Sequence, residues 1–199
     1  MIVSPEWMDI EKSQDFLRAH LHPFEGRFAN EEPANNHLNI AYAETQESYR
    51  EEIALSAARM LIQYDIRPQF IAAVPTGATG WGRAIGNALS VLDHDISPRY
   101  IDLSKKAKRE FDLPSDYDER AHILELAKAN ATGIVVDDAS SDGGTSEAFA
   151  DFCTAKGFDV AGILVIVYRG ETEPESAYNR YAVMQHHIPR FINWNDWRV

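Results

Sequence analysis

Cysteine is nearly absent from this chain of 199 residues, which contains only Cys153. A single cysteine cannot form an intrachain disulfide, so a disulfide framework is excluded and nothing indicates an oxidising compartment. Cys153 lies in a segment with helical spacing, where a small apolar side chain packs well against neighbours. We therefore expect Cys153 to belong to the core rather than to act as a nucleophile.

Long hydrophobic runs and positive charge are also scarce. The longest apolar run, Ile163 to Tyr168, is far shorter than the roughly 20 residues that span a bilayer. The first nine residues carry acids where a signal peptide has basic side chains, so we expect a cytoplasmic protein with no membrane partner. With 31 acidic and 19 basic side chains the net charge is −12, which repels phosphate backbones and excludes nucleic acid as a general partner.

No internal repeat, low-complexity tract or linker divides the chain, so we expect one domain over residues 1–199. Apolar residues at three- and four-residue spacing predict helices at about 6–20, 48–64, 81–89, 119–129 and 145–156. Short apolar runs predict strands at 70–74, 99–103, 133–136 and 160–167, whereas the polar residues 23–36 indicate a loop or a short hairpin. This alternation is typical of an α/β fold with a mainly parallel sheet, whose ligands bind beyond the carboxyl ends of the strands.

The segment from Ile134 to Ser146 carries the strongest functional pattern. Two adjacent carboxylates, Asp137 and Asp138, follow a buried strand, and small residues then lead into a helix. Backbone N–H groups of such a loop can converge on a phosphate, which the helix N-terminus also attracts. Neighbouring acids can accept hydrogen bonds from vicinal hydroxyls or hold hydrated Mg²⁺, so the pattern suits a ribose 5-phosphate. The alternative is a plain turn in which Ser and Thr cap the helix and the acids favour its dipole.

The whole string resembles the signature with which type I phosphoribosyltransferases bind phosphoribosyl pyrophosphate (PRPP). The matching residues are Asp137, Asp138, Ser141, Gly143, Gly144 and Thr145. The resemblance implies that Ala139, Ser140 and Asp142 also contact PRPP. Asp142 departs from the family, which usually has Thr or Ala there, and its carboxylate would either point to solvent or weaken phosphate binding. The resemblance further implies a hood over about residues 1–48, a core over about 49–170 and a tail over 171–199.

A short loop after the first predicted core strand also resembles this family. In these enzymes the equivalent loop holds pyrophosphate on exposed backbone amides, which here would belong to Thr76, Gly77 and Ala78. The alternative is an ordinary Pro-Thr-Gly turn.

The basic cluster 105–109 follows the strand at 99–103, where orotate phosphoribosyltransferases have a mobile catalytic loop with the pattern Arg-Lys-Glu-x-Lys and then His-Gly. Lys105 and Lys108 fall on the two lysines, and the resemblance implies that they neutralise pyrophosphate. The departures from the pattern are Ser104 for the Arg, Lys106 for the Glu, and Glu110-Phe111 for the His-Gly. The alternative for such a charge run is a solvated helix face.

The segment Tyr168–Glu171 resembles the Asp-Arg-x-Glu of orotate enzymes, in which the Arg binds the polar edge of the base. Arg169 and Ser141 are therefore the expected base-binding residues, since a guanidinium can pair with carboxylate or carbonyl oxygens. The alternative is a surface arginine on a turn. His37 and Leu38 stand where the family's hood has a stacking aromatic, so we expect that ring to be missing. The tail matches no family pattern, and we expect Trp194 and Trp197 to pack against a neighbouring surface.

Taken together, the resemblance implies an enzyme of pyrimidine biosynthesis that transfers phosphoribosyl from PRPP to a nucleobase, with orotate favoured, and releases pyrophosphate. Its expected catalytic residues are Lys105, Lys108, Asp137 and Asp138. Mg²⁺ is the implied cofactor, bound through PRPP and reaching Asp137 and Asp138 through water, and a homodimer is the implied assembly. Two alternatives stay open: a regulatory protein that binds PRPP or a nucleotide without catalysis, and a phosphoribosyltransferase for a purine or another base.

Overall fold

The computed structural model describes residues 2–3, 10–27, 33–75, 77–107, 109–171 and 175–195. Its centre is a six-stranded sheet with the order β1-β10-β9-β8-β4-β5, in which every neighbouring pair of strands is parallel. The strands are β1 (Ile2–Val3), β4 (Phe70–Ala73), β5 (Arg99–Ile101), β8 (Thr132–Ser140), β9 (Asp159–Tyr168) and β10 (Arg180–Gln185). The predicted α/β fold with a parallel sheet is confirmed.

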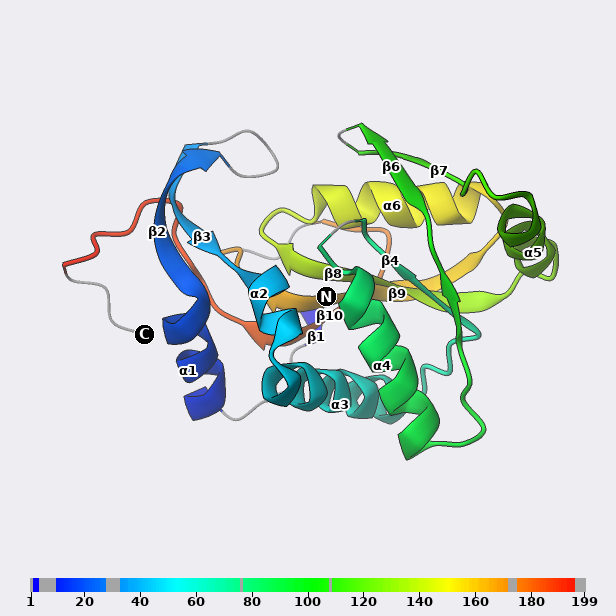
Figure 1. Ribbon diagram of the computed structural model, residues 1–199, viewed down its shortest axis with the longest axis horizontal. Coiled ribbons are helices and arrows are strands. Elements are labelled where there is room, and N and C mark those ends of the chain that lie inside the picture. The colour runs from blue at the N-terminus through cyan, green and yellow to red at the C-terminus, as the bar shows by residue number, and fades with distance from the viewer. Residues whose placement is uncertain are drawn as a thin grey trace.

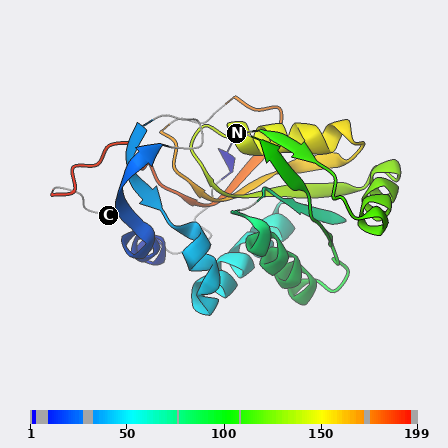
Figure 2. The same cartoon turned by 45° about the horizontal axis from the view of Figure 1, so that its top comes forward.

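Helices cover both faces of this sheet. In Figure 1, α3 and α4 lie on one face and α6 lies on the other, and the turned view of Figure 2 shows the same layers. The three helices are α3 (Glu47–Gln63), α4 (Thr79–Leu92) and α6 (Gly144–Ala155). A fourth helix, α5 (Tyr117–Lys128), lies at one end of the sheet. Each was predicted from its apolar spacing, although α4 begins two residues before the expected Trp81.

The core forms between α6 and the middle strands because their apolar residues face each other. Four residues at three- and four-residue spacing are buried along α6: Ser146, Phe149, Ala150 and Cys153. They face continuous apolar runs in β8 and β9, which are buried because helices cover both sides of the sheet. The expected core position of Cys153 is confirmed, and burial raises the pKa of its thiol to about 12.

The N-terminal segment forms a separate layer at one end of the sheet (Figure 1). It contains α1 (Ile10–His20), the antiparallel strands β2 (Leu21–Arg27) and β3 (Pro33–Leu38), and α2 (Ile40–Thr45). The Asn39 side chain caps α2 by accepting a hydrogen bond from the Tyr42 N–H. Of the two structures allowed for residues 23–36, the hairpin is the one that forms.

Five of the described elements were not predicted. They are β1, α2, β10 and the two strands of an antiparallel hairpin that contains the basic cluster, β6 (Ser104–Ala107) and β7 (Glu110–Asp112). Because β10 belongs to the central sheet, the sheet extends into the segment regarded as the tail. Trp194 packs against the core and donates to the Asn35 carbonyl oxygen, whereas Trp197 lies outside the described residues. Within the part of the chain that is described, no helix is long and apolar enough to cross a membrane.

Candidate active site

Three of the predicted site segments meet at the carboxyl edge of the sheet. The pairing of β8 with β4 and β9 brings the ends of these strands together, because Val74 N–H donates to the Val136 carbonyl and Arg169 N–H donates to the Ser140 carbonyl, each at 2.8 Å. The Tyr168 hydroxyl also donates to the Ser141 carbonyl at 3.1 Å. The loops after β4, β8 and β9 are therefore neighbours, as expected for a parallel sheet.

Asp137 and Asp138 form a coupled pair of carboxyls near the end of β8. Asp137 is only 5% exposed, accepts a hydrogen bond from the Asp138 N–H at 3.0 Å, and contacts the Ser146 hydroxyl on α6. Burial, and then the charge of Asp138, raise the pKa of Asp137 well above its usual value. Burial also raises the pKa of Asp138, although the Ala139 N–H, the Asp137 carboxyl and nearby His37 counteract this. Burial therefore disfavours the charged form of both carboxyls.

The loop after β4 packs against Asp138 and a second carboxylate. A Cβ on Gly77 would collide with the Asp138 carboxylate where it now lies, so a larger residue there would require this side chain to move. Ala78 is buried before the first turn of α4, and Thr76 lies outside the described residues. At Gly80 the backbone N–H donates to the carboxylate of Glu44, which comes from α2.

Glu44 is a site residue that the sequence did not indicate, because it lies in an unpredicted helix. Burial raises the pKa of its carboxyl, and the nearby charge of Asp138 adds to this, whereas the Gly80 N–H and Arg50 lower it. Glu44 and Asp138 thus bring two carboxylates to one glycine loop.

The loop after β8 turns sharply at Gly143, whose φ is +75°. A Cβ there would collide with the Arg180 guanidinium, so both the backbone conformation and the space require glycine. Gly144 begins α6, and its N–H donates to the Asp142 carboxylate at 3.0 Å. Asp142 therefore hydrogen-bonds its own loop while its side chain stays half-exposed, and the expected weakening of phosphate binding stays a prediction.

The β6–β7 hairpin lies over α6 (Figures 1 and 2). Phe111 anchors it, with its ring centroid 4.7 Å from that of Phe149 and 6.2 Å from that of Phe152. Lys105 is exposed on β6, Lys108 lies outside the described residues, and Arg109 reaches the start of α6. The alternative of a solvated helix face for this basic run is wrong, because the run forms a hairpin.

Arg169 is buried at the end of β9, so the alternative of a surface arginine is wrong. Its Nη2 donates to the Asn36 side-chain oxygen at 2.6 Å. Asn36 lies on β3 and donates in turn to the carbonyls of Pro189 and Arg190, each at 2.9 Å. Burial lowers the pKa of Arg169 to about 10. The N-terminal hairpin therefore orients this guanidinium.

The same hairpin supplies an aromatic pair. The rings of Phe24 on β2 and His37 on β3 are 5.6 Å apart, and His37 lies near enough to lower the pKa of Asp138. Positions 37 and 38 hold no benzene or indole ring, as the sequence has it, but Phe24 lies beside His37 and brings such a ring to this place. Sequence reasoning missed this contact, because Phe24 and His37 meet through the pairing of β2 with β3.

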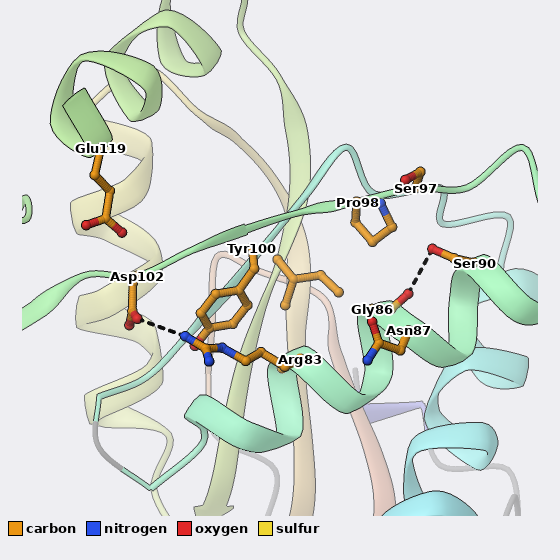
Figure 3. Close-up of a pocket in the computed structure, with 11 residues that line it drawn as sticks. Arg83, Gly86, Asn87, Ser90, Ser97, Pro98, Tyr100, Asp102 and Glu119 are labelled. Carbon is orange, nitrogen blue, oxygen red and sulfur yellow. Dashed lines mark hydrogen bonds and ion pairs between the residues drawn. The ribbon is translucent and has the colours of Figure 1, made fainter.

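A polar pocket of about 550 Å³ lies elsewhere, between α4 and β5. Figure 3 shows Arg83 reaching Asp102 beside the Tyr100 ring. The Arg83 Nη2 lies 3.3 Å from Asp102 Oδ2, and its guanidinium carbon lies 4.9 Å from the ring centroid. None of the predicted site residues that the structure describes lines this pocket.

We predict that Asp137→Asn stabilises the protein at neutral pH. Folding raises the pKa of Asp137 above the unfolded value of about 3.9. At pH values between the unfolded and the folded pKa, the folded state binds more protons than the unfolded state, so the free energy of unfolding falls as pH rises. Asparagine keeps the acceptor for the Asp138 N–H without charge, and we expect a gain of about 1–2 kcal/mol near pH 7.5. Thermal unfolding in EDTA measures it; the gain should vanish near pH 4, and a pH-independent loss would contradict the assignment.

We also predict that Phe111→Ala releases the β6–β7 hairpin from α6. Removing a buried ring that contacts two others costs about 3 kcal/mol or less, depending on how well the site collapses. Limited trypsin digestion should then cut faster within 105–109, as followed by mass spectrometry. Phe191→Ala, at an exposed phenylalanine, is the control and should leave this rate unchanged. Equal cleavage in both variants would show that Phe111 does not hold the hairpin.

Comparisons with known proteins agree with this arrangement. No protein-family model and no curated protein matches the chain. Among solved structures, the UMP synthase of Leishmania donovani aligns with a TM-score of 0.65 and 17% identity over 91% of this chain, although this chain spans only 37% of that protein.

Two orotate phosphoribosyltransferases align over most of both chains. The Aeropyrum pernix protein has a TM-score of 0.57 and 19% identity, with 87% of this chain and 92% of that chain covered. The Mycobacterium tuberculosis protein, in complex with inorganic phosphate, has a TM-score of 0.59 and 15% identity, with 88% and 94% covered. At these identities the likeness establishes the fold, and the chain therefore has the type I phosphoribosyltransferase fold.

Proposed function

We propose that this protein is a Mg²⁺-dependent phosphoribosyltransferase that transfers the phosphoribosyl group of PRPP to a nucleobase, with orotate as the favoured base. One observation carries the proposal. Two glycine-containing loops, after β4 and β8, lie side by side at the carboxyl edge of the sheet, each opens a helix, and Asp138 packs against the first of them.

Each part of PRPP has a suitable partner in this arrangement. Backbone N–H groups of residues 140–145 and the N-terminus of α6 would bind the 5-phosphate. The amides of Thr76, Gly77 and Ala78, before α4, would bind pyrophosphate. Asp138 is half-buried beside Gly77 and would accept hydrogen bonds from the ribose hydroxyls, while Asp137 fixes it from the protein interior.

The carboxylates fit Mg²⁺ only as a metal carried by the substrate. Among the described residues, no group of three or more His, Cys, Asp or Glu side chains could hold a metal ion. Asp137 is buried, so Asp138 is the better-placed carboxylate, with phosphate oxygens and water as the remaining ligands that Mg²⁺ usually takes. When bound, the metal would neutralise negative charge on pyrophosphate.

In the proposed reaction, the bond between the ribose C1 and pyrophosphate breaks, and pyrophosphate leaves with the electron pair. A base nitrogen then forms the new bond to C1, and the proton that this nitrogen carried passes to water or to the released pyrophosphate. Positive charge develops on the sugar and negative charge on the leaving group, so fixed dipoles and cations lower the barrier. The loop amides and the lysines Lys105 and Lys108 would stabilise the leaving group, and the β6–β7 hairpin would exclude water.

Arg169 and Ser141 are the proposed base-binding residues. Orotate carries a carboxylate and carbonyl oxygens, which a guanidinium recognises through paired hydrogen bonds. Asn36 orients the Arg169 guanidinium, which supports a positioned role for it. Phe24 and His37 would offer ring surface to a planar base.

A binding protein without catalysis is the second candidate. The Asp142 carboxylate already occupies the Gly144 N–H, and Lys106 forms an ion pair with Asp112 at 2.7 Å within the hairpin. Both features depart from the family's pattern, in the phosphate loop and in the lysine loop, and a protein that binds PRPP or a nucleotide without catalysis would tolerate such departures.

Titration calorimetry of PRPP with Mg²⁺ tests the binding step. We expect the wild type to bind and Asp138→Asn to lose about tenfold or more in affinity, because a carboxylate that accepts hydroxyl hydrogen bonds is worth about 1.5–3 kcal/mol. Asp95→Asn is the matched control, since it removes an exposed carboxylate from the loop before β5.

Pyrophosphate release with orotate, uracil, adenine, guanine and xanthine then tests catalysis. Release with orotate alone supports the favoured base, and release with another base reassigns the specificity. Binding with no release for any base would favour the regulatory candidate, and a wild type that produces no heat with PRPP and Mg²⁺ would contradict the proposal.

A further inference from the structure

Asp142 places a negative charge inside the loop that would bind the 5-phosphate. Its Oδ1 accepts the Gly144 N–H at 3.0 Å, and its side chain is 52% exposed. The first N–H groups of a helix have no partner within the helix, and they are the donors that an anion at this place would use. The protein's own carboxylate therefore sits on a donor that the proposed phosphate needs.

Arg109 approaches the same loop from the β6–β7 hairpin. Its φ of +58° places it in the turn between the strands, and Phe111 holds the hairpin on α6. The guanidinium packs so closely on Gly144 that a Cβ there would collide with it, and its Nη2 lies 3.7 Å from Asp142 Oδ2. A cation and an anion of the chain thus face each other across the start of α6.

A second arginine approaches the loop from the protein interior. Arg180 begins β10 and is 2% exposed, and its Nη2 donates to the Gly143 carbonyl at 3.4 Å and to Glu147 at 3.3 Å. Its Nε and Nη1 have no hydrogen-bond partner among the described residues. Burying guanidinium N–H groups in this way is costly, and the energy is recovered where a strong anion binds close by. Two arginines therefore flank the α6 N-terminus.

We propose that Asp142 is a built-in counter-anion of the loop after β8. Its carboxylate occupies this loop when no ligand is bound, and the 5-phosphate displaces it and pairs with Arg109 in its place. This inference rests on the proposed function, because it concerns the 5-phosphate part of that site. The exchange is feasible since the Asp142–Arg109 pair is half-exposed and 3.7 Å apart, and such pairs contribute little stability. A phosphate offers Arg109 shorter, charge-assisted and bidentate hydrogen bonds.

The proposal requires effects of opposite sign from the two partners. Asp142→Asn keeps an oxygen for the Gly144 N–H but removes the competing charge, so phosphate should bind more tightly. Arg109→Gln keeps a polar, though shorter, side chain and removes the cation, so phosphate should bind more weakly. A merely structural pair would instead show losses in both variants.

Titration calorimetry with ribose 5-phosphate, and separately with inorganic phosphate, measures these effects on the full chain. We expect affinity to rise about fivefold to tenfold in Asp142→Asn and to fall about tenfold in Arg109→Gln, as for removing one charge close to a partly exposed anion site. Lys106→Gln is the matched control, because it removes the same charge from the same hairpin at a side chain that pairs with Asp112. It should change affinity less than twofold, and thermal unfolding verifies that all variants fold.

The outcomes separate this inference from the proposed function. Wild-type binding of ribose 5-phosphate that Asp142→Asn leaves unchanged or weakens would overturn the counter-anion and leave the proposed function standing. Equal losses in Arg109→Gln and Lys106→Gln would overturn the role of Arg109. Binding by Asp142→Asn but not by the wild type would support the inference. No binding of ribose 5-phosphate or PRPP by any form would contradict both.

Discussion

The parallel pairing of β8 with β4 on one side and β9 on the other is the constraint on which the site depends. It fixes the register Ala73 to Val136 and Ser140 to Tyr168, so the three loops that follow emerge at one edge. Because these strands are buried on both faces, their apolar side chains hold that register strongly, and a slip would expose the core. The loops can then carry glycines without loss of the fold.

The site brings together negative and positive groups of the same chain. Three carboxylates meet the two loops, since Asp138 packs on Gly77, Glu44 accepts the Gly80 N–H, and Asp142 accepts the Gly144 N–H. In a protein of net charge −12, an anionic ligand has to find local positive potential, which the helix N-termini, Arg109 and Arg180 supply at the second loop. The acidic composition excludes general binding of polyanions but not a site of this kind.

The sequence allowed prediction wherever the signal was local. The strand β8, the two acids, the glycines and the helix α6 are contiguous in the chain. Their spacing, together with the resemblance to the type I phosphoribosyltransferase signature, therefore indicated both elements and the candidate phosphate loop. The contacts that shape the site join segments distant in the chain, such as Arg169 with Asn36 and Arg180 with Gly143. The spacing of apolar residues along the sequence does not indicate such contacts. The β6–β7 hairpin was missed for another reason: Ser104 to Ala107 are all exposed, so β6 has no alternation of apolar and polar residues.

A crystal structure of the protein with ribose 5-phosphate would show where the phosphate binds. We expect phosphate oxygens about 3 Å from the Gly144 N–H, a hydrogen-bond distance, with the Arg109 guanidinium on the phosphate and the Asp142 carboxylate turned away. Phosphate density away from the start of α6, with Asp142 still on the Gly144 N–H, would contradict this expectation.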